Sequence, residues 1–188
     1  MKPSRSPGVR LSGGEFRGRV LAVPKGARPS EGRVREALFS IWNQRLEGAR
    51  LLDLFAGSGA VALESIGRGA LRAVAVEGDL QALETIEANA AKLGKGLIEI
   101  RKMTLPAGLA RIAQAEETFD LVFADPPYAF NAYAGLLSGI SPLLAEDGEA
   151  VIEHSARVPL VEEAGELVRT DVRRYGEIAL SFYRRAAV

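Results

Sequence analysis

The sequence predicts a doubly wound α/β fold, and three features of its pattern support this prediction. From residue 50 onward, short apolar runs of β type alternate with longer helical stretches. The first apolar run ends in a glycine turn that opens a helix. Near the C-terminus, two strand-like runs follow each other too closely for a helical crossover, which predicts an antiparallel hairpin at the sheet edge.

Composition limits the class of protein. The chain has 188 residues, of which 47% are hydrophobic and 26% charged, which suits one packed core with a small appendage. It has no cysteine and one histidine, which excludes disulfides and both thiolate and histidine-rich metal sites, so we expect no metal. No apolar run approaches the roughly 20 residues of a membrane helix, and no secretory-type segment opens the chain. A cytoplasmic protein is expected.

Residues 1–49 are predicted to form a basic N-terminal extension ahead of a core domain at 50–188. The first 50 residues hold eleven basic and four acidic side chains, although the whole chain has a formal net charge of zero. Glycines between short β-type pieces at 9–23 predict a small hairpin. A helix follows, with Ser30 as its N-cap. Its apolar face recurs at helical spacing: Val34, Leu38, Ile41, Trp42 and Leu46.

In the core, each apolar run is too apolar to lie exposed on both faces, so we predict strands of a buried sheet. These runs are 50–56, 72–77, 97–101, 119–124 and 149–153. Helices are predicted at 59–68 and 80–93, the second ended by Gly94 as a C-cap. The closing hairpin consists of 167–175 and 178–184.

The string LLDLFAGSGA at 51–60 predicts a cofactor site. Gly57 and Gly59 leave room for a ligand to approach backbone N–H groups. Two other interpretations are open: a nicotinamide-binding turn, whose third glycine is replaced here by Ala62, and a turn that only packs strand on helix. The turn residues expected to contact the cofactor are Asp53, Phe55, Ala56, Gly57, Ser58 and Gly59.

Two acidic residues favour S-adenosylmethionine as that cofactor. Asp53 ends the first strand, where it suits the cationic amino group of a methionine moiety and would repel a pyrophosphate. Glu77, followed by Gly78, closes the second strand, where a carboxylate can accept both ribose hydroxyls; the alternative is a solvated strand end. Met103 and Thr104 follow the third strand and are expected to contact the adenine, through their backbone.

The string FDLVFADPPY at 119–128 predicts the reaction site. Ligands of such sheets bind at the carboxyl ends of strands near the switch in strand order, so this motif should lie beside the glycine turn. A proline loop that merely ends a strand is the alternative. The residues assigned to the chemistry are Asp125, Pro126, Pro127 and Tyr128.

This motif suits methylation of an exocyclic amino group on a nucleobase. Such an amine is a poor nucleophile because its lone pair is delocalised into the ring. A carboxylate and a backbone carbonyl aimed at its N–H bonds would localise the lone pair, and two prolines rigidify that carbonyl. Tyr128 offers a ring for stacking the base, worth about 1–3 kcal/mol.

The basic extension predicts contacts with the phosphates of a structured RNA. A merely solubilising surface is the alternative. The charge excess also suggests that substrate recognition and chemistry lie on separable parts of the chain. The residues assigned to RNA are Arg17, Arg19, Lys25, Arg28, Arg33 and Arg35.

Several strings together resemble a known family. They are GEFRGRVLAVPKGARP at 14–29, RVREALFSIW at 33–42, LLDLFAGSGAVALESIGRGA at 51–70, the DPPY motif and YGEIALSFY at 175–183. Over nearly the whole chain, they are similar to the RsmD family of bacterial 16S ribosomal RNA guanine-N2 methyltransferases. The resemblance implies a Rossmann-like class I methyltransferase sheet of seven strands. It also implies methyl transfer from S-adenosylmethionine to one guanine, in 16S rRNA or an assembling small subunit.

Three other functions compete with this interpretation. An N6-adenine nucleic-acid methyltransferase would need a target-recognition domain, for which the chain has little room. A protein glutamine methyltransferase usually resembles Asn-Pro-Pro-Tyr instead of the sequence at 125–128. A noncatalytic RNA-binding assembly factor could retain the cofactor pocket. We expect a monomer without a membrane partner, and the target nucleotide stays open.

Overall fold

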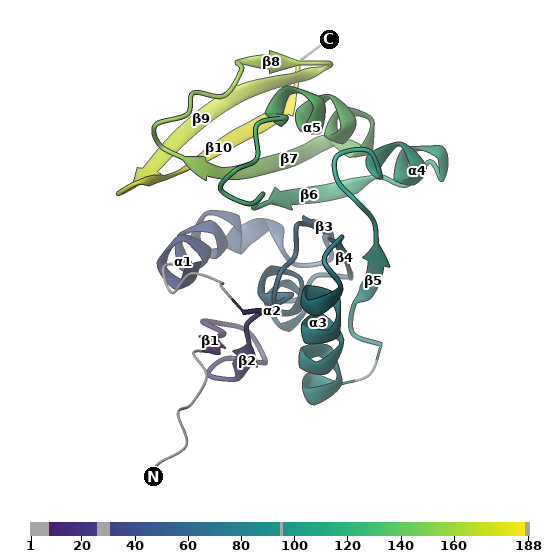
Figure 1. The fold of residues 1–188 in the computed structure, drawn as a ribbon, viewed down its shortest axis with the longest axis vertical. Helices are drawn as coiled ribbons and strands as arrows, with labels where there is room; N and C mark the ends of the chain where they lie inside the picture. The colour runs from purple at the N-terminus through teal and green to yellow at the C-terminus, as the bar shows by residue number, and fades with distance from the viewer. Residues whose placement is uncertain (1–7, 26–30, 95, 187–188) are drawn as a thin grey trace.

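The computed structural model describes residues 8–25, 31–94 and 96–186. Its centre is one sheet with the strand order β5-β4-β3-β6-β7-β10-β9-β8 (Figure 1). β5, β4, β3, β6 and β7 run parallel to one another, and β10 pairs antiparallel with both β7 and β9. The strands are β3 (Arg50–Leu54), β4 (Arg72–Glu77), β5 (Glu99–Lys102), β6 (Phe119–Ala124), β7 (Leu144–Ser155), β8 (Glu163–Ala164), β9 (Leu167–Tyr175) and β10 (Ile178–Arg185).

All seven predicted core strands are present, and the two-residue β8 adds an eighth at the edge. β4, β6 and β9 match their predicted ranges, whereas β7 begins five residues earlier than predicted, at Leu144. β3 ends at Leu54, two residues before the predicted Ala56, because Phe55 has a φ of 59° and leaves the extended conformation.

Helices cover both faces of the sheet, which makes three layers. They are α1 (Glu31–Trp42), α2 (Ala60–Gly67), α3 (Leu80–Leu93), α4 (Leu109–Gln114) and α5 (Tyr133–Ile140). One hydrophobic cluster joins α1, α2 and α3 to the sheet face that carries Leu51 and Phe123. Another joins α4 and α5 to the face that carries Leu52 and Ala124. Burial on both faces explains the near-continuous apolar strands.

The predicted N-terminal hairpin is present as the antiparallel pair β1 (Gly8–Arg10) and β2 (Val20–Ala22). Its apolar side chains Leu11, Phe16 and Leu21 are buried against Ala60 and Leu63 of α2. Each such buried leucine or phenylalanine contributes about 1.5–3 kcal/mol. The hairpin is therefore a packed part of the core.

A buried ion network fastens the extension to α2. The Glu64 carboxylate is fully buried and accepts hydrogen bonds from the guanidinium of Arg35 at 3.1 Å and that of Arg68 at 2.8 Å. It also accepts from the backbone N–H of Ser12 at 3.1 Å. Because a buried charge without partners is costly, these contacts fix the hairpin, α1 and α2 relative to one another.

The predicted helix after the hairpin is α1, and Ser30, its predicted N-cap, lies outside the described residues. Val34, Leu38 and Trp42 of the predicted apolar face are buried, and the Trp42 indole N–H donates to Glu149 at 3.0 Å. Leu46 is buried beyond the end of the helix. No helix within the described part of the chain is long and apolar enough to span a bilayer.

Candidate active site

The glycine turn after β3 has an unusual backbone. Phe55, Gly57 and Gly59 all adopt positive φ, at 59°, 57° and 74°. For a phenylalanine this conformation costs on the order of 1–3 kcal/mol and persists only where the surroundings enforce it. The Phe55 ring packs edge-on against Phe130, with 5.4 Å between the ring centroids. The turn is therefore a strained loop held by its neighbours, as is common at binding sites.

Glu77 organises this turn. One carboxylate oxygen accepts the backbone N–H of Gly57 at 3.0 Å, and the other accepts those of Gly78 at 2.7 Å and Asp79 at 2.9 Å. These bonds join the end of β4 to the turn after β3. The carboxylate of Glu77 thus stands at the predicted place, and it is anchored rather than simply solvated.

Asp53 is a buried member of the same site. Its side chain is 2% exposed and accepts the backbone N–H of Ala62 in the first turn of α2 at 3.2 Å. Burial, reinforced by the nearby charges of Asp125 and Glu77 and opposed by the Ala62 hydrogen bond, raises the pKa of Asp53 to about 8. A cation placed beside it would favour the ionised form.

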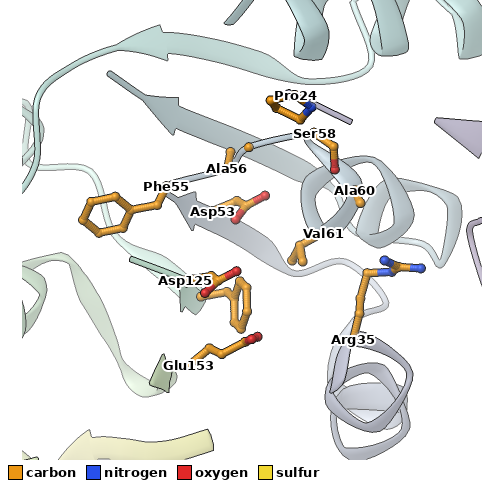
Figure 2. Close-up of a pocket in the computed structure, with 12 residues that line it drawn as sticks. Pro24, Arg35, Asp53, Phe55, Ala56, Ser58, Ala60, Val61, Asp125 and Glu153 are labelled. Atoms are coloured by element: carbon orange, nitrogen blue, oxygen red, sulfur yellow. The ribbon is translucent and has the colours of Figure 1, made fainter. Parts of the chain in front are cut away.

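A pocket of about 90 Å³ lies at the carboxyl ends of the central strands. Asp53 and the turn residues form one side of the pocket (Figure 2). Phe123 of β6, Asp125 directly after β6 and Glu153 of β7 also line it. The other lining residues are Pro24, Arg35, Ala60 and Val61. The predicted neighbourhood of glycine turn and DPPY motif is thus present.

The DPPY motif joins this pocket because β6 lies beside β3. Leu54 pairs with Ala124, and the next backbone N–H, that of Asp125, donates to the Leu54 carbonyl at 3.3 Å. Pro126 is buried and Pro127 is exposed. The Pro127 carbonyl accepts the N–H of Phe130 at 2.8 Å, which closes the loop as a turn.

Aromatic rings border the motif. Tyr128 has 75% of its surface exposed, so its ring lies where a base could stack. Phe130 and Tyr133 meet edge to face with 5.1 Å between the ring centroids. Burial, with a contribution from the charge of Asp125, raises the pKa of Tyr133, which places that phenol in the electrostatic field of the motif.

The predicted adenine contacts lie beside Gly78. The Met103 N–H donates to the Glu77 carbonyl at 3.0 Å, and a Cβ added to Gly78 would stand 3.1 Å from the Met103 carbonyl oxygen. The absence of a side chain at Gly78 therefore allows β4 and the segment after β5 to approach closely. Thr104 is exposed at the same place.

The basic residues assigned to RNA fall into three groups. Arg17, Arg19, Lys25 and Arg33 are exposed. Arg28 lies outside the described residues. Arg35 differs from the prediction: it is 5% exposed, pairs with Glu64 and donates to the Arg10 carbonyl at 2.6 Å, so its charge is already committed inside the protein. Its helical spacing placed it on the buried face of α1, beside Val34 and Leu38.

Sequence reasoning missed two buried polar residues of the site. Glu153 lines the pocket from β7 and is 9% exposed. Asn89 of α3 is fully buried; its amide nitrogen donates to the carbonyls of Ala22 and Ser58, both at 2.9 Å, and its oxygen accepts the Ala22 N–H at 2.9 Å. Nothing in the sequence distinguishes Asn89 from the other polar residues of its helix. Glu153 resembles a charged residue that ends an apolar strand, so its burial was not predicted.

These residues fit S-adenosylmethionine. Gly57 and Gly59 keep side chains out of the turn, so a ligand can approach its backbone closely. The carboxylate anchored at the end of β4 is of the kind that accepts hydroxyl groups, and the buried carboxyl of Asp53 suits a cationic amine. Among the described residues, no group of histidine and acidic side chains is arranged to hold a metal ion.

Comparison with known proteins agrees with this geometry. The family model described as "Conserved hypothetical protein 95" matches residues 9–184. Ribosomal RNA small subunit methyltransferase D of Escherichia coli K12 is 34% identical over 99% of this chain and 96% of its own.

Solved structures agree as well. One described as "Putative methyltransferase yhhF from Escherichia coli" superposes with a TM-score of 0.83 at 28% identity, over 97% of this chain and all of that one. A hypothetical protein of Thermus thermophilus gives a TM-score of 0.82 at 34% identity, over 94% and 99% of the two chains. The predicted class I methyltransferase fold is confirmed.

Proposed function

The chain belongs to the RsmD family, and from that premise we propose that it transfers a methyl group from S-adenosylmethionine to the N2 amine of a guanine in 16S ribosomal RNA. One observation carries the proposal. The β3–β6 pairing brings Asp125 and the strained glycine turn to the same pocket, so an amine held by the motif would lie beside a cofactor held by the turn.

The turn, Asp53 and Glu77 are the proposed cofactor residues. When bound, the cofactor supplies a methyl group on a cationic sulfur, which is a strong electrophile. Glu77 would accept the ribose hydroxyls while it keeps the turn in place, and Asp53 would face the amino group. Met103 and Thr104 would border the adenine, at the position where Gly78 admits them.

The DPPY residues would activate the guanine amine. The Asp125 carboxylate and the Pro126 carbonyl accept hydrogen bonds from the two N–H groups of this amine. These bonds favour a geometry in which the nitrogen lone pair is localised and points at the methyl group. The nitrogen would gain the methyl group as the bond between that carbon and the cofactor sulfur breaks, which would leave S-adenosylhomocysteine, and the nitrogen would afterwards release one proton. Tyr128 would stack on the base. Because the partners are held in place, much of the rate would come from orientation.

The exposed residues Arg17, Arg19, Lys25 and Arg33 are the proposed phosphate contacts. The substrate is 16S rRNA, naked or within an assembling small subunit, and the target guanine would have to leave any stack or pair before it reached the pocket. We also propose a cytoplasmic location and a monomeric state. Size-exclusion chromatography with light scattering tests the second of these.

Nucleoside mass spectrometry tests the function. Ribosomal RNA from cells without the protein should lack one N2-methylguanosine, and the wild-type gene should restore it. Loss of an N6-methyladenosine instead would assign the chain to adenine methylation. An unchanged nucleoside profile would favour a noncatalytic assembly factor.

The variant Asp125→Ala connects this test to the site. It should bind S-adenosylhomocysteine normally and lose methyl transfer by at least ~100-fold, since its carboxylate acts on the charge that develops at the amine. Single-turnover rates with saturating cofactor measure the loss. If cofactor binding collapses while the bound-state rate survives, Asp125 positions the cofactor and our assignment is wrong.

A further inference from the structure

Glu153 stands next to Asp125 on the adjacent strand. β6 and β7 are parallel, with Phe123 opposite Val151 and Ala124 opposite Ile152. Asp125 and Glu153 come next in this register, two residues beyond Phe123 and Val151, which puts their side chains on the same face. Neighbouring strands lie about 4.8 Å apart. Both side chains line the pocket, where Figure 2 shows them together.

Two carboxylates in one cross-strand row offer a ligand two hydrogen-bond acceptors side by side. Glu153 is 9% exposed, so water would screen a hydrogen bond to it only weakly. A ligand that presents N–H donors to both carboxylates at once would stabilise the arrangement.

We propose that Glu153 selects guanine. The Watson–Crick edge of guanine carries the N1–H beside the N2 amine, so it offers adjacent donors to two adjacent carboxylates. Glu153 accepts the N1–H while Asp125 accepts an N–H of the amine. Adenine presents an unprotonated N1 beside its amine, and this lone pair would face the carboxylate of Glu153. The inference rests on the proposed function and adds the residue that reads the base.

The base 2-aminopurine tests this role, because it keeps the exocyclic amine of guanine and lacks the N1–H. The substrate is small-subunit rRNA with either guanosine or 2-aminopurine riboside at the position where mass spectrometry finds the missing methyl group. Single-turnover transfer by the wild-type protein should be about 10- to 100-fold faster on guanosine, the range expected of one good base-reading contact. Equal rates would overturn the proposal.

The variant Glu153→Gln should reduce this preference at least ~10-fold, because its amide can donate to the bare N1 of 2-aminopurine. Its affinity for S-adenosylhomocysteine, measured by calorimetry, should stay within about twofold of wild type. The matched control Glu146→Gln alters an exposed residue of the same strand and should leave the preference unchanged. A Glu153→Gln variant that keeps the wild-type preference would also overturn the proposal.

If Glu153→Gln does not fold, Glu153→Asp decides. Its shortened carboxylate withdraws from the base, so transfer to guanosine should slow while transfer to 2-aminopurine should not, and an unchanged preference contradicts the assignment. A wild-type protein that methylates no guanosine-containing RNA would instead refute the proposed function. The two failures are therefore distinct.

Discussion

Acidic side chains dominate the site, and their surroundings give them different properties. Glu77 accepts three backbone N–H groups, which anchor its carboxylate between the turn and the start of α3. Asp53 accepts one, and burial raises its pKa to about 8 in spite of that hydrogen bond. The two residues look alike in the sequence, as acids at strand ends, and only the fold separates their chemistry.

Substitution of Glu77 should weaken cofactor binding. Glu77→Ala removes the proposed ribose acceptor and also releases the Gly57 N–H, so the affinity for S-adenosylhomocysteine should fall by about 1–3 kcal/mol. Calorimetry measures the change, with Glu84→Ala on the exposed face of α3 as control. Unchanged affinity would mean that Glu77 neither binds the ribose nor holds the turn in a shape that the cofactor requires.

The raised pKa of Asp53 predicts a pH-dependent stability. The pKa of Asp53 is higher in the folded protein than its ordinary value of 3.8, so the folded state holds this proton more tightly than the unfolded state does. Asp53 therefore contributes its full stabilisation at a pH low enough for it to be protonated in both states. This contribution falls as pH rises from about 4 to about 8. The upper limit of the fall is about 6 kcal/mol, at 1.36 kcal/mol for each pKa unit.

Asp53→Asn imitates the protonated form, so its stability relative to wild type should increase over this pH window. Urea unfolding at pH 5, 6.5 and 8 measures the difference between the two proteins, and Glu146→Gln serves as an exposed control. A difference that stays constant across the three pH values would show that Asp53 is ionised throughout.

At the scale of elements, the hairpin, α3 and the glycine turn form one connected unit. Asn89 on α3 bonds Ala22 of β2 and Ser58 of the turn, although these partners are 67 and 31 residues away in the chain. A displacement of the hairpin is therefore expected to reach the cofactor turn through one side chain.

Asn89→Leu should break this connection. It keeps the approximate volume and leaves the N–H of Ala22 and the carbonyls of Ala22 and Ser58 without their partner, at about 1–3 kcal/mol for each group that stays buried. Unfolding free energy and S-adenosylhomocysteine affinity should both fall. The control Glu87→Leu changes an exposed residue of the same helix. Normal cofactor affinity in a folded Asn89→Leu protein would show that the turn holds its shape alone.

The elements were predictable where the sequence pattern is local. Apolar runs and glycines gave β4, β6, β9 and α3 within their observed bounds. β7 was predicted too short because its first half carries Glu146, Asp147 and Gly148, which resemble a loop but continue the strand, with Glu146 and Asp147 exposed and Gly148 buried. β5, with two exposed residues out of four, has too weak a pattern to fix its bounds.

The sequence motifs of the site could be predicted, but the partners of its buried side chains could not. The glycine turn, Glu77 and the DPPY motif each stand at the carboxyl end of a strand, so parallel topology alone brings them together. Asn89, Glu153 and the Arg35–Glu64 pair depend on which distant segments meet, and no spacing along the chain reveals that. Arg35 was therefore assigned to RNA, although its buried partner Glu64 lies in α2.

For the whole molecule, the structure argues against separable recognition and chemistry. Leu11, Phe16 and Leu21 of the hairpin complete a hydrophobic cluster with α2, and Ser12 bonds the buried Glu64. Deletion of residues 1–28 would expose that cluster and remove partners of Glu64 and Asn89. Its effect on RNA binding would then report unfolding as well as lost charge, and substitutions of single surface charges are the cleaner test.

Arg17 and Arg19 suit this test because both are exposed and, within the described residues, neither side chain has a hydrogen bond or ion pair with the protein. The double variant Arg17→Gln/Arg19→Gln should keep its fold and its affinity for S-adenosylhomocysteine. Its RNA affinity should fall, and the slope of log affinity against log salt should decrease by about 1 for each phosphate that is no longer neutralised. Salt titrations of binding to small-subunit rRNA measure both slopes, with Arg111→Gln on the exposed face of α4 as the control for removal of a positive charge elsewhere. A double variant with the wild-type slope would show that the RNA is held by another surface. An equal decrease of the slope in Arg111→Gln would show a general effect of net charge. If the RNA binds at the hairpin, only substitution of the hairpin arginines should change the number of ions released on binding.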